Sequence, residues 1–131
     1  MENELVVSYR GGIGFNVSTR QHEMTIDLSK EKGGEDLGFN PPEVFMASLG
    51  SCIGVYVARY CQNAKLDASG LKISLAWKLS EDKTWIDEIS AKVSLPNADL
   101  GARSKAVLEV AKHCLIHNTI LNSPKINISL G

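Results

Sequence analysis

The chain has 131 residues, of which 44% are hydrophobic and 22% are charged, and its formal net charge is −1. This length and balance predict one globular domain, residues 1–131, around a single core. The basic residues are scattered, which argues against the clustered basic face that binds nucleic acid or an acidic membrane surface. We therefore expect neither nucleic acid nor a membrane as a partner.

The N-terminal sequence MENELVVSYR lacks the basic start and the long apolar run of a secretory signal peptide. The longest apolar stretch, residues 44–58, is shorter than the roughly 20 residues that cross a bilayer. We interpret it as part of a buried core helix and expect a cytoplasmic protein. Three cysteines in such a protein do not form a disulfide framework, so they are core residues, metal ligands or redox residues.

The first 40 residues predict three strands. Residues 4–10 and 15–20 flank Gly11-Gly12-Ile13-Gly14, which predicts a hairpin whose glycine turn needs positive φ angles. The segment MTIDL, residues 24–28, alternates apolar and polar side chains and predicts the third strand. A polar, glycine-rich loop follows at residues 29–40.

The rest of the chain predicts helices and strands in alternation. A helix from Pro41 to about residue 63 has so few charges that we expect it to be buried on nearly all sides. Strands 71–80 and 84–96 form a hairpin, and the segment 125–131 is a last strand. A second helix, residues 99–117, is predicted by an apolar stripe at Val107, Val110, Ala111 and Cys114. The order is βββ-α-ββ-α-β, an α+β fold with largely antiparallel sheets.

Cys52 lies in SLGSCIG, where small residues surround the sulfur. A glycine inside a helix costs up to about 1 kcal/mol relative to alanine, so Gly50 and Gly54 indicate the close approach of another element or of a substrate. Both explanations stay open at this point. Cys61 is nine residues further along the same helix, on the opposite side, and we interpret it as structural.

Cys114 is followed by His117 at the i+3 position, where the imidazole ring can lie near the sulfur. A nearby imidazolium would lower the pKa of the thiol and favour the reactive thiolate. The alternative is a histidine favoured by the C-terminal end of the helix dipole. Cys52, Cys114, His117 and His22 could also make a zinc site. No two cysteines have the close spacing of a zinc motif, so we favour redox chemistry and expect no metal or cofactor.

The chain contains the segments GGEDLGFNPPEVFMASLGSC and AKHCLIHNTI. They resemble the osmotically inducible protein C / organic hydroperoxide resistance (OsmC/Ohr) family, and its OsmC-like branch in particular. The resemblance implies an intertwined homodimer with its two long helices at the centre and a thiol peroxidase site at the subunit interface. It implies that Cys52 is the peroxidatic cysteine and Cys114 the resolving one. The substrate would be an organic hydroperoxide, and a dithiol, lipoyl-type or other, would reduce the disulfide.

The chain departs from the family pattern near the first cysteine. The hydroperoxide-resistance members of the family typically carry glutamate directly after an Asn-Pro pair, and this glutamate pairs with an arginine near the thiolate. Here Pro42 follows that pair and the acid is Glu43, a shift that rotates the side chain by about 100° on a helix. For the arginine we prefer Arg20, because Arg20 and His22 would share one strand face. Two solvated strand residues are the alternative.

One function of another class also stays open. The same fold could serve as a non-catalytic binding protein for a hydrophobic small molecule, with the cysteines lining an apolar pocket.

Overall fold

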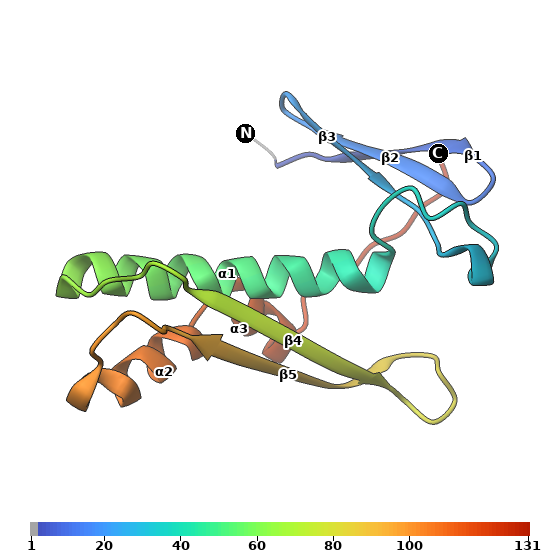
Figure 1. The fold of residues 1–131 in the computed structure, drawn as a ribbon. Coiled ribbons are helices and arrows are strands. Elements are labelled where there is room, and N and C mark those ends of the chain that lie inside the picture. Colours follow the sequence, from blue (N-terminus) through green and yellow to red (C-terminus); the bar gives the residue numbers. More distant parts are fainter. Residues whose placement is uncertain (1–2) are drawn as a thin grey trace. The chain divides into compact units, whose positions relative to one another are not determined.

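The computed structural model describes residues 3–131, which form an N-terminal unit ending at Ala47 and a C-terminal unit of Ser48–Gly131. Three strands precede a long helix, and a two-stranded hairpin and two short helices follow it (Figure 1). Every strand pair is antiparallel. The predicted α+β class is therefore confirmed.

The N-terminal unit contains one sheet of three strands in the order β1-β2-β3. These strands are β1 (Val6–Gly11), β2 (Gly14–Thr19) and β3 (His22–Ile26). The predicted glycine hairpin is confirmed, since Gly11 and Gly12 have φ angles of 118° and 58°, which a residue with a Cβ rarely adopts.

Strand β3 ends earlier than predicted because the next residue, Asp27, holds the following loop. The Asp27 carboxylate accepts hydrogen bonds from the backbone N–H groups of Leu28, Glu35 and Leu37 at 2.8, 3.1 and 3.3 Å. Burial alone would raise the pKa of Asp27, but these bonds and the charge of Arg10 together hold that pKa below its ordinary value. The polar loop is thus folded around one buried carboxylate.

Helix α1 (Pro41–Ala64) begins with a reciprocal cap. The Glu43 N–H donates to Asn40 Oδ1 at 2.9 Å, and the Asn40 N–H donates to Glu43 Oε1 at 2.8 Å. This is a capping box, with Asn40 as the N-cap. The two prolines fill the first helical positions, where no intrahelical N–H is needed.

The C-terminal unit packs α1 against the hairpin of β4 (Lys72–Leu79) and β5 (Ile86–Ser94). In Figure 1 the helix runs along this hairpin. The buried core joins α1 to the segment that follows the hairpin, and its members are Leu49, Ile53, Val57, Cys61, Val107, Ala111 and Cys114. Cys61 is fully buried, so its interpretation as a structural residue agrees with its position.

The two glycines beside Cys52 face β4. A Cβ on Gly50 would lie 2.7 Å from Leu75 Cδ1, and one on Gly54 would lie 3.7 Å from Ile73 Cγ1. At Gly50 the close approach is therefore that of a strand, and the packing of α1 on β4 accounts for this glycine without a substrate. A Cβ on Gly54 would make only an ordinary contact, so this packing does not require a glycine there.

One side of α1 is exposed in the single chain, contrary to the prediction that it is buried on nearly all sides. The exposed stripe consists of Ser48, Ser51, Val55, Arg59 and Gln62. By length and composition α1 could cross a membrane, a property that core helices of globular proteins share. Its opposite side packs into the core described above, as expected of such a core helix.

The predicted second helix is two helices. A 3₁₀ turn (Gly101–Arg103) leads into α2 (Ser104–Lys112), and α3 (Leu115–Leu121) follows after a break. Cys114 lies in the break with φ −73° and ψ 151°, which is extended backbone. The apolar stripe is nevertheless real, since Val107, Ala111 and Cys114 are buried.

The predicted last strand is not formed in the described chain. Residues 123–131 have no strand assignment, and the side chains of Ile126, Ile128 and Leu130 are 76%, 92% and 102% exposed. A strand needs a neighbour for its N–H and C=O groups, and this segment pairs with no strand of residues 3–131.

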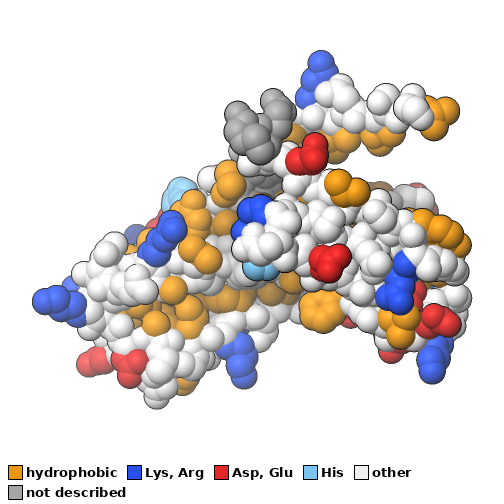
Figure 2. Space-filling model, turned by 90° about the horizontal axis from the view of Figure 1, so that it is seen from above, with side chains coloured by type: hydrophobic (Ala, Val, Ile, Leu, Met, Phe, Trp, Pro, Cys, Tyr) orange, Lys and Arg blue, Asp and Glu red, His pale blue; other side chains and the backbone are white. Residues whose placement is uncertain are grey.

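Figure 2 shows apolar side chains at the surface on one face of the single chain.

Candidate functional site

The structure brings Cys52 and Cys114 together in the C-terminal unit. Cys52, on α1, is half-buried and packs against the core cluster that contains Cys114. Cys114 is fully buried. Both are free thiols, as is Cys61. Cys52 is therefore the partly exposed member of the pair in the single chain, whereas Cys114 is enclosed by its protein neighbours.

Cys114 is the N-cap residue of α3, and its Sγ atom accepts the backbone N–H of His117 at 3.3 Å. Burial raises the pKa of the Cys114 thiol, and the neighbouring Cys52 raises it further. The N–H groups of His117 and Ile116 oppose this rise without cancelling it. Cys114 is therefore a protonated thiol at neutral pH.

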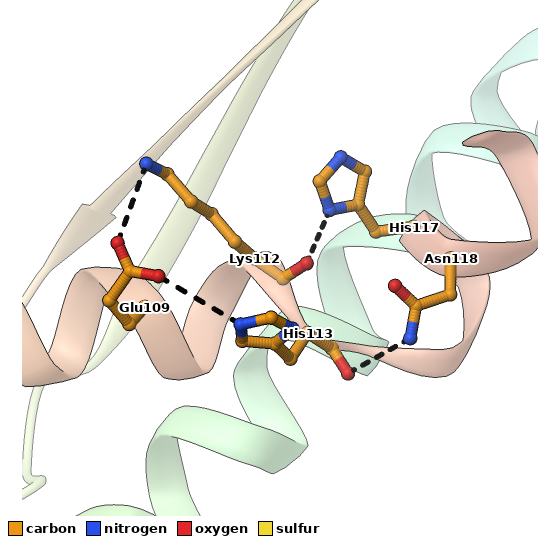
Figure 3. Close-up of polar contacts among 5 residues, drawn as sticks. All are labelled: Glu109, Lys112, His113, His117 and Asn118. Atoms are coloured by element: carbon orange, nitrogen blue, oxygen red, sulfur yellow. Dashed lines mark hydrogen bonds and ion pairs between the residues drawn. The ribbon is translucent and has the colours of Figure 1, made fainter.

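The His117 ring is turned toward the end of α2. Its Nδ1 atom lies 2.7 Å from the carbonyl oxygen of Lys112 (Figure 3). A carbonyl only accepts, so Nδ1 carries the hydrogen of this bond. The side chain of Asn118 donates to the carbonyl of His113 at 3.4 Å, a second tie between α3 and the end of α2. His117 therefore touches the sulfur through its backbone and uses its ring to hold the helix break.

The other predicted site residues lie in the N-terminal unit. Glu43 is exposed and its carboxylate is engaged in the helix cap. Arg20 lies in the turn between β2 and β3 with φ 52°, so the prediction that it shares a strand face with His22 is wrong. His22 begins β3 opposite Thr19, and both Arg20 and His22 are exposed.

The geometry does not support the zinc alternative. Among residues 3–131, no three side chains of histidine, cysteine, aspartate or glutamate are arranged to hold a metal ion. The His117 ring is turned toward the carbonyl of Lys112, and it does not form a ligand set with Cys52 and Cys114.

The sequence analysis missed two features, the cap at the start of α1 and the helix break at Cys114. The spacing Asn40-x-x-Glu43 is a capping-box signature, so the role of Glu43 could have been found there. The break at Cys114 had no comparable signal, because cysteine is not among the preferred N-cap residues.

Solved structures show the same fold at low sequence identity. An OsmC-like protein from Mycoplasma pneumoniae matches with a TM-score of 0.75 and 18% identity, over 94% of this chain and 89% of that one. A hypothetical protein from Aquifex aeolicus matches with a TM-score of 0.74 and 24% identity, over 94% and 89%. The organic hydroperoxide resistance protein OsmC from Legionella pneumophila matches with a TM-score of 0.68 and 15% identity, over 92% and 89%.

No curated protein matches the sequence. The family model described as "OsmC-like protein" matches residues 33–129, which include both cysteines of the pair and most of the chain. The chain therefore belongs to the OsmC-like protein family.

Proposed function

We propose that this protein is a cytoplasmic thiol peroxidase that reduces organic hydroperoxides through Cys52 and Cys114. The observation that carries the proposal is the pairing of a half-buried Cys52 with a fully buried Cys114. Only Cys52 is open to a solute, so it takes the peroxidatic role. Cys114 cannot meet the peroxide and takes the resolving role.

The reaction has two steps on these sulfurs. The Cys52 thiolate attacks the terminal oxygen of the hydroperoxide, the O–O bond breaks, and the leaving alkoxide takes a proton to become the alcohol. Cys52 is then a sulfenic acid. The Cys114 thiol attacks that sulfur, the S–O bond breaks, and water leaves as the disulfide forms. An external dithiol returns both thiols by exchange, through a mixed disulfide.

The substrate class rests on the relatives and on the surroundings of the thiol. The Legionella pneumophila structure is named an organic hydroperoxide resistance protein. Cys52 packs among the apolar residues of the core, where an alkyl group is better accommodated than water. This favours organic hydroperoxides over hydrogen peroxide.

We also propose that the chain acts as one OsmC-like domain, residues 1–131, in a homodimer. The exposed stripe on α1 leaves Val55 46% exposed on a helix that is otherwise suited to a core. Both sheets are small and have unpaired edge strands in the described chain. A second copy would cover these features. Supporting roles for Glu43, Arg20 and His22 beside the thiolate stay predictions.

The test is a peroxide titration of the reduced protein, with an organic hydroperoxide and hydrogen peroxide in parallel. Free thiols and intact mass are the readouts. We expect one equivalent of the organic peroxide to consume two thiols quickly and to give a disulfide that maps to Cys52 and Cys114. If the three thiols oxidise slowly and alike, the proposal is wrong.

A further inference from the structure

The two helices on either side of Cys114 are joined by side chains rather than by their backbones. Helix α2 ends at Lys112, whose carbonyl oxygen has no intrahelical partner, as is general for the last turn of a helix. Among residues 3–131, no backbone N–H donates to this oxygen. The Nδ1–H group of His117 supplies the donor at 2.7 Å (Figure 3). The ring of a residue on α3 therefore holds the end of α2.

His117 also contacts the sulfur of Cys114. Its backbone N–H donates to Cys114 Sγ at 3.3 Å. Cys114 has extended backbone between the two helices, so its position depends on how α2 and α3 are held together. A second bond across the break, from the side chain of Asn118 to the carbonyl of His113, is longer at 3.4 Å. His117 thus ties the sulfur of Cys114 to both helices, through contacts that lie within one chain.

The position of this sulfur decides how readily it reaches Cys52. Burial raises the pKa of the Cys114 thiol, and Cys52 is near enough to raise it further. Reactions between groups held on one scaffold depend steeply on geometry, and a displacement of about 1 Å can cost about a hundredfold in rate. A disulfide also accepts only a narrow range of Cα separations, about 4.4–6.8 Å. A looser break would therefore disfavour both the formation of the disulfide and the disulfide itself.

We propose that the imidazole ring of His117 is a positioning residue for the Cys52–Cys114 disulfide and acts by donating its hydrogen bond to the carbonyl of Lys112. This role belongs to the second step of the proposed peroxidase reaction and rests on that proposed function. In this step the sulfur of Cys114 attacks the sulfenic acid of Cys52, the S–S bond forms, and the S–O bond breaks. The hydroxyl group leaves as water with the proton of the thiol. Slow attack leaves the sulfenic acid to a second peroxide, which oxidises it to a sulfinic acid.

Two substitutions separate the hydrogen bond from the ring that makes it. His117→Phe keeps a planar ring and removes the donor. His117→Asn removes the ring but places an amide N–H where Nδ1 stands, because the amide nitrogen of asparagine and Nδ1 of histidine are both bonded to Cγ. His113→Phe is the matched control, because the His113 ring is exposed and contacts Glu109 of α2, at 3.8 Å, instead of bridging to α3.

The first measurement is the thiol–disulfide equilibrium of the full-length protein with mixtures of oxidised and reduced dithiothreitol, which needs no peroxide. Intact mass after alkylation gives the extent of oxidation, and peptide mapping shows whether the disulfide joins Cys52 to Cys114. We expect His117→Phe to shift this equilibrium about tenfold toward the free thiols, because the sulfurs are less well placed. His117→Asn and His113→Phe should shift it by about threefold or less.

The second measurement is the rate of disulfide formation after the reduced protein is mixed with excess cumene hydroperoxide. At high peroxide the first step is fast, so the attack of Cys114 limits the rate. We expect His117→Phe to slow this attack about tenfold and to leave more sulfenic and sulfinic acid on Cys52, while the initial loss of the Cys52 thiol is unchanged. His117→Asn should recover the rate.

A loss of stability in α3 is distinguished from a loss of position by Ile120→Val. Ile120 packs against the core and takes no part in the hydrogen bonds across the break. This variant should lower the unfolding temperature and leave the dithiothreitol equilibrium within about threefold of the natural chain. A shift as large as that of His117→Phe would make the loosening of α3 the cause, and the positioning role would be wrong.

Three further results would overturn the role of His117. They are natural behaviour of His117→Phe in both assays, failure of His117→Asn to recover what His117→Phe loses, and the absence of a Cys52–Cys114 disulfide with either oxidant. If the thiol of Cys52 does not react with the hydroperoxide but the disulfide forms with dithiothreitol, the proposed peroxidase function is wrong. The dithiothreitol equilibrium then still decides whether His117 positions Cys114.

Discussion

The sulfur of Cys114 accepts the backbone N–H of His117 at 3.3 Å, so the proposed resolving thiol is also the residue that starts α3. Loss of this sulfur would remove a helix cap as well as a reactive group. The ring of the same His117 holds the end of α2 through the carbonyl of Lys112. The chemistry and the local fold therefore share one short segment, and substitutions there need readouts that separate stability from reactivity.

The roles of the two cysteines can be separated by serine substitution. We expect Cys52→Ser to lose fast consumption of an organic hydroperoxide, because the remaining pair member is fully buried. Cys114→Ser should still react once, leaving a sulfenic acid on Cys52 that dimedone traps. Mass spectrometry of the trapped adduct is the measurement.

Cys61→Ser is the control for this pair, because Cys61 is fully buried in the core of the same unit. It should keep the fast reaction with peroxide. Loss of the reaction in Cys61→Ser, with the fold intact, would contradict the assignment of Cys52 and Cys114.

The raised pKa of Cys114 predicts that stability falls at alkaline pH. The folded state holds this proton more tightly than the unfolded chain does, so the unfolded chain ionises first as pH rises. The contribution is fully present below the ordinary thiol pKa of 9.0 and is lost as pH rises through the folded pKa. Urea unfolding under reducing conditions, from about pH 7 to about pH 10, measures this effect. The unfolding free energy should fall more steeply with pH for the natural chain than for Cys114→Ala. Parallel slopes would show that burial does not raise the pKa of this thiol.

The carboxylate of Asp27 predicts the opposite pH behaviour in the N-terminal unit. Its pKa is lowered, so its contribution to stability is present above the unfolded value of 3.8 and is lost as pH falls through the folded pKa. Asp27→Asn should lower the stability at neutral pH, because it weakens the three hydrogen bonds that hold the loop. As pH is lowered, the loss of folded structure followed by circular dichroism should then depend less on pH for the variant than for the natural chain.

The cap of α1 gives a test of Glu43. Asn40→Ala and Glu43→Ala should each cost about 0.5–2 kcal/mol of unfolding free energy, because each removes half of the capping box. Glu43→Gln keeps an oxygen that accepts the Asn40 N–H and should retain most of the stability. The peroxidase rate of Glu43→Gln then decides whether Glu43 also acts beside the thiolate. An unchanged rate assigns Glu43 to the cap, whereas a large loss of rate in a stable protein would restore its predicted role beside the thiolate.

The two glycines beside Cys52 form a matched pair. Gly54→Ala places a methyl group at an ordinary contact distance of 3.7 Å from Ile73, so it should gain about 0.5–1 kcal/mol in helix propensity. Gly50→Ala places one only 2.7 Å from Leu75 Cδ1, so it should be less stable than Gly54→Ala by about 1–3 kcal/mol. Chemical denaturation measures both. Gly50→Ala combined with Leu75→Ala should recover part of the difference if that contact is the cause.

Much of the fold followed from local patterns. The glycine hairpin, the hairpin of β4 and β5, the start of α1 and the α+β class were predicted correctly, because each depends on residues that are close in sequence. The buried stripe of Val107, Ala111 and Cys114 was also found from its helical spacing. The break at Cys114 was missed, because that spacing continues through it while the backbone does not.

By itself, the sequence determined the order of the elements as far as α2, the apolar stripe that α2 buries and the membership in the family, since these are properties of short segments. Only the tertiary structure decided that Cys52 lies against Cys114 and that Leu75 fills the space at Gly50. It also decided that the ring of His117 is hydrogen-bonded to the carbonyl oxygen of Lys112. The pairing of Cys52 with Cys114 and of Gly50 with Leu75 joins segments that lie far apart in the chain, so it depends on how α1 meets the hairpin and the α2–α3 break. Segment 125–131 shows the same limit, because its alternating pattern allows a strand but strand formation requires a partner.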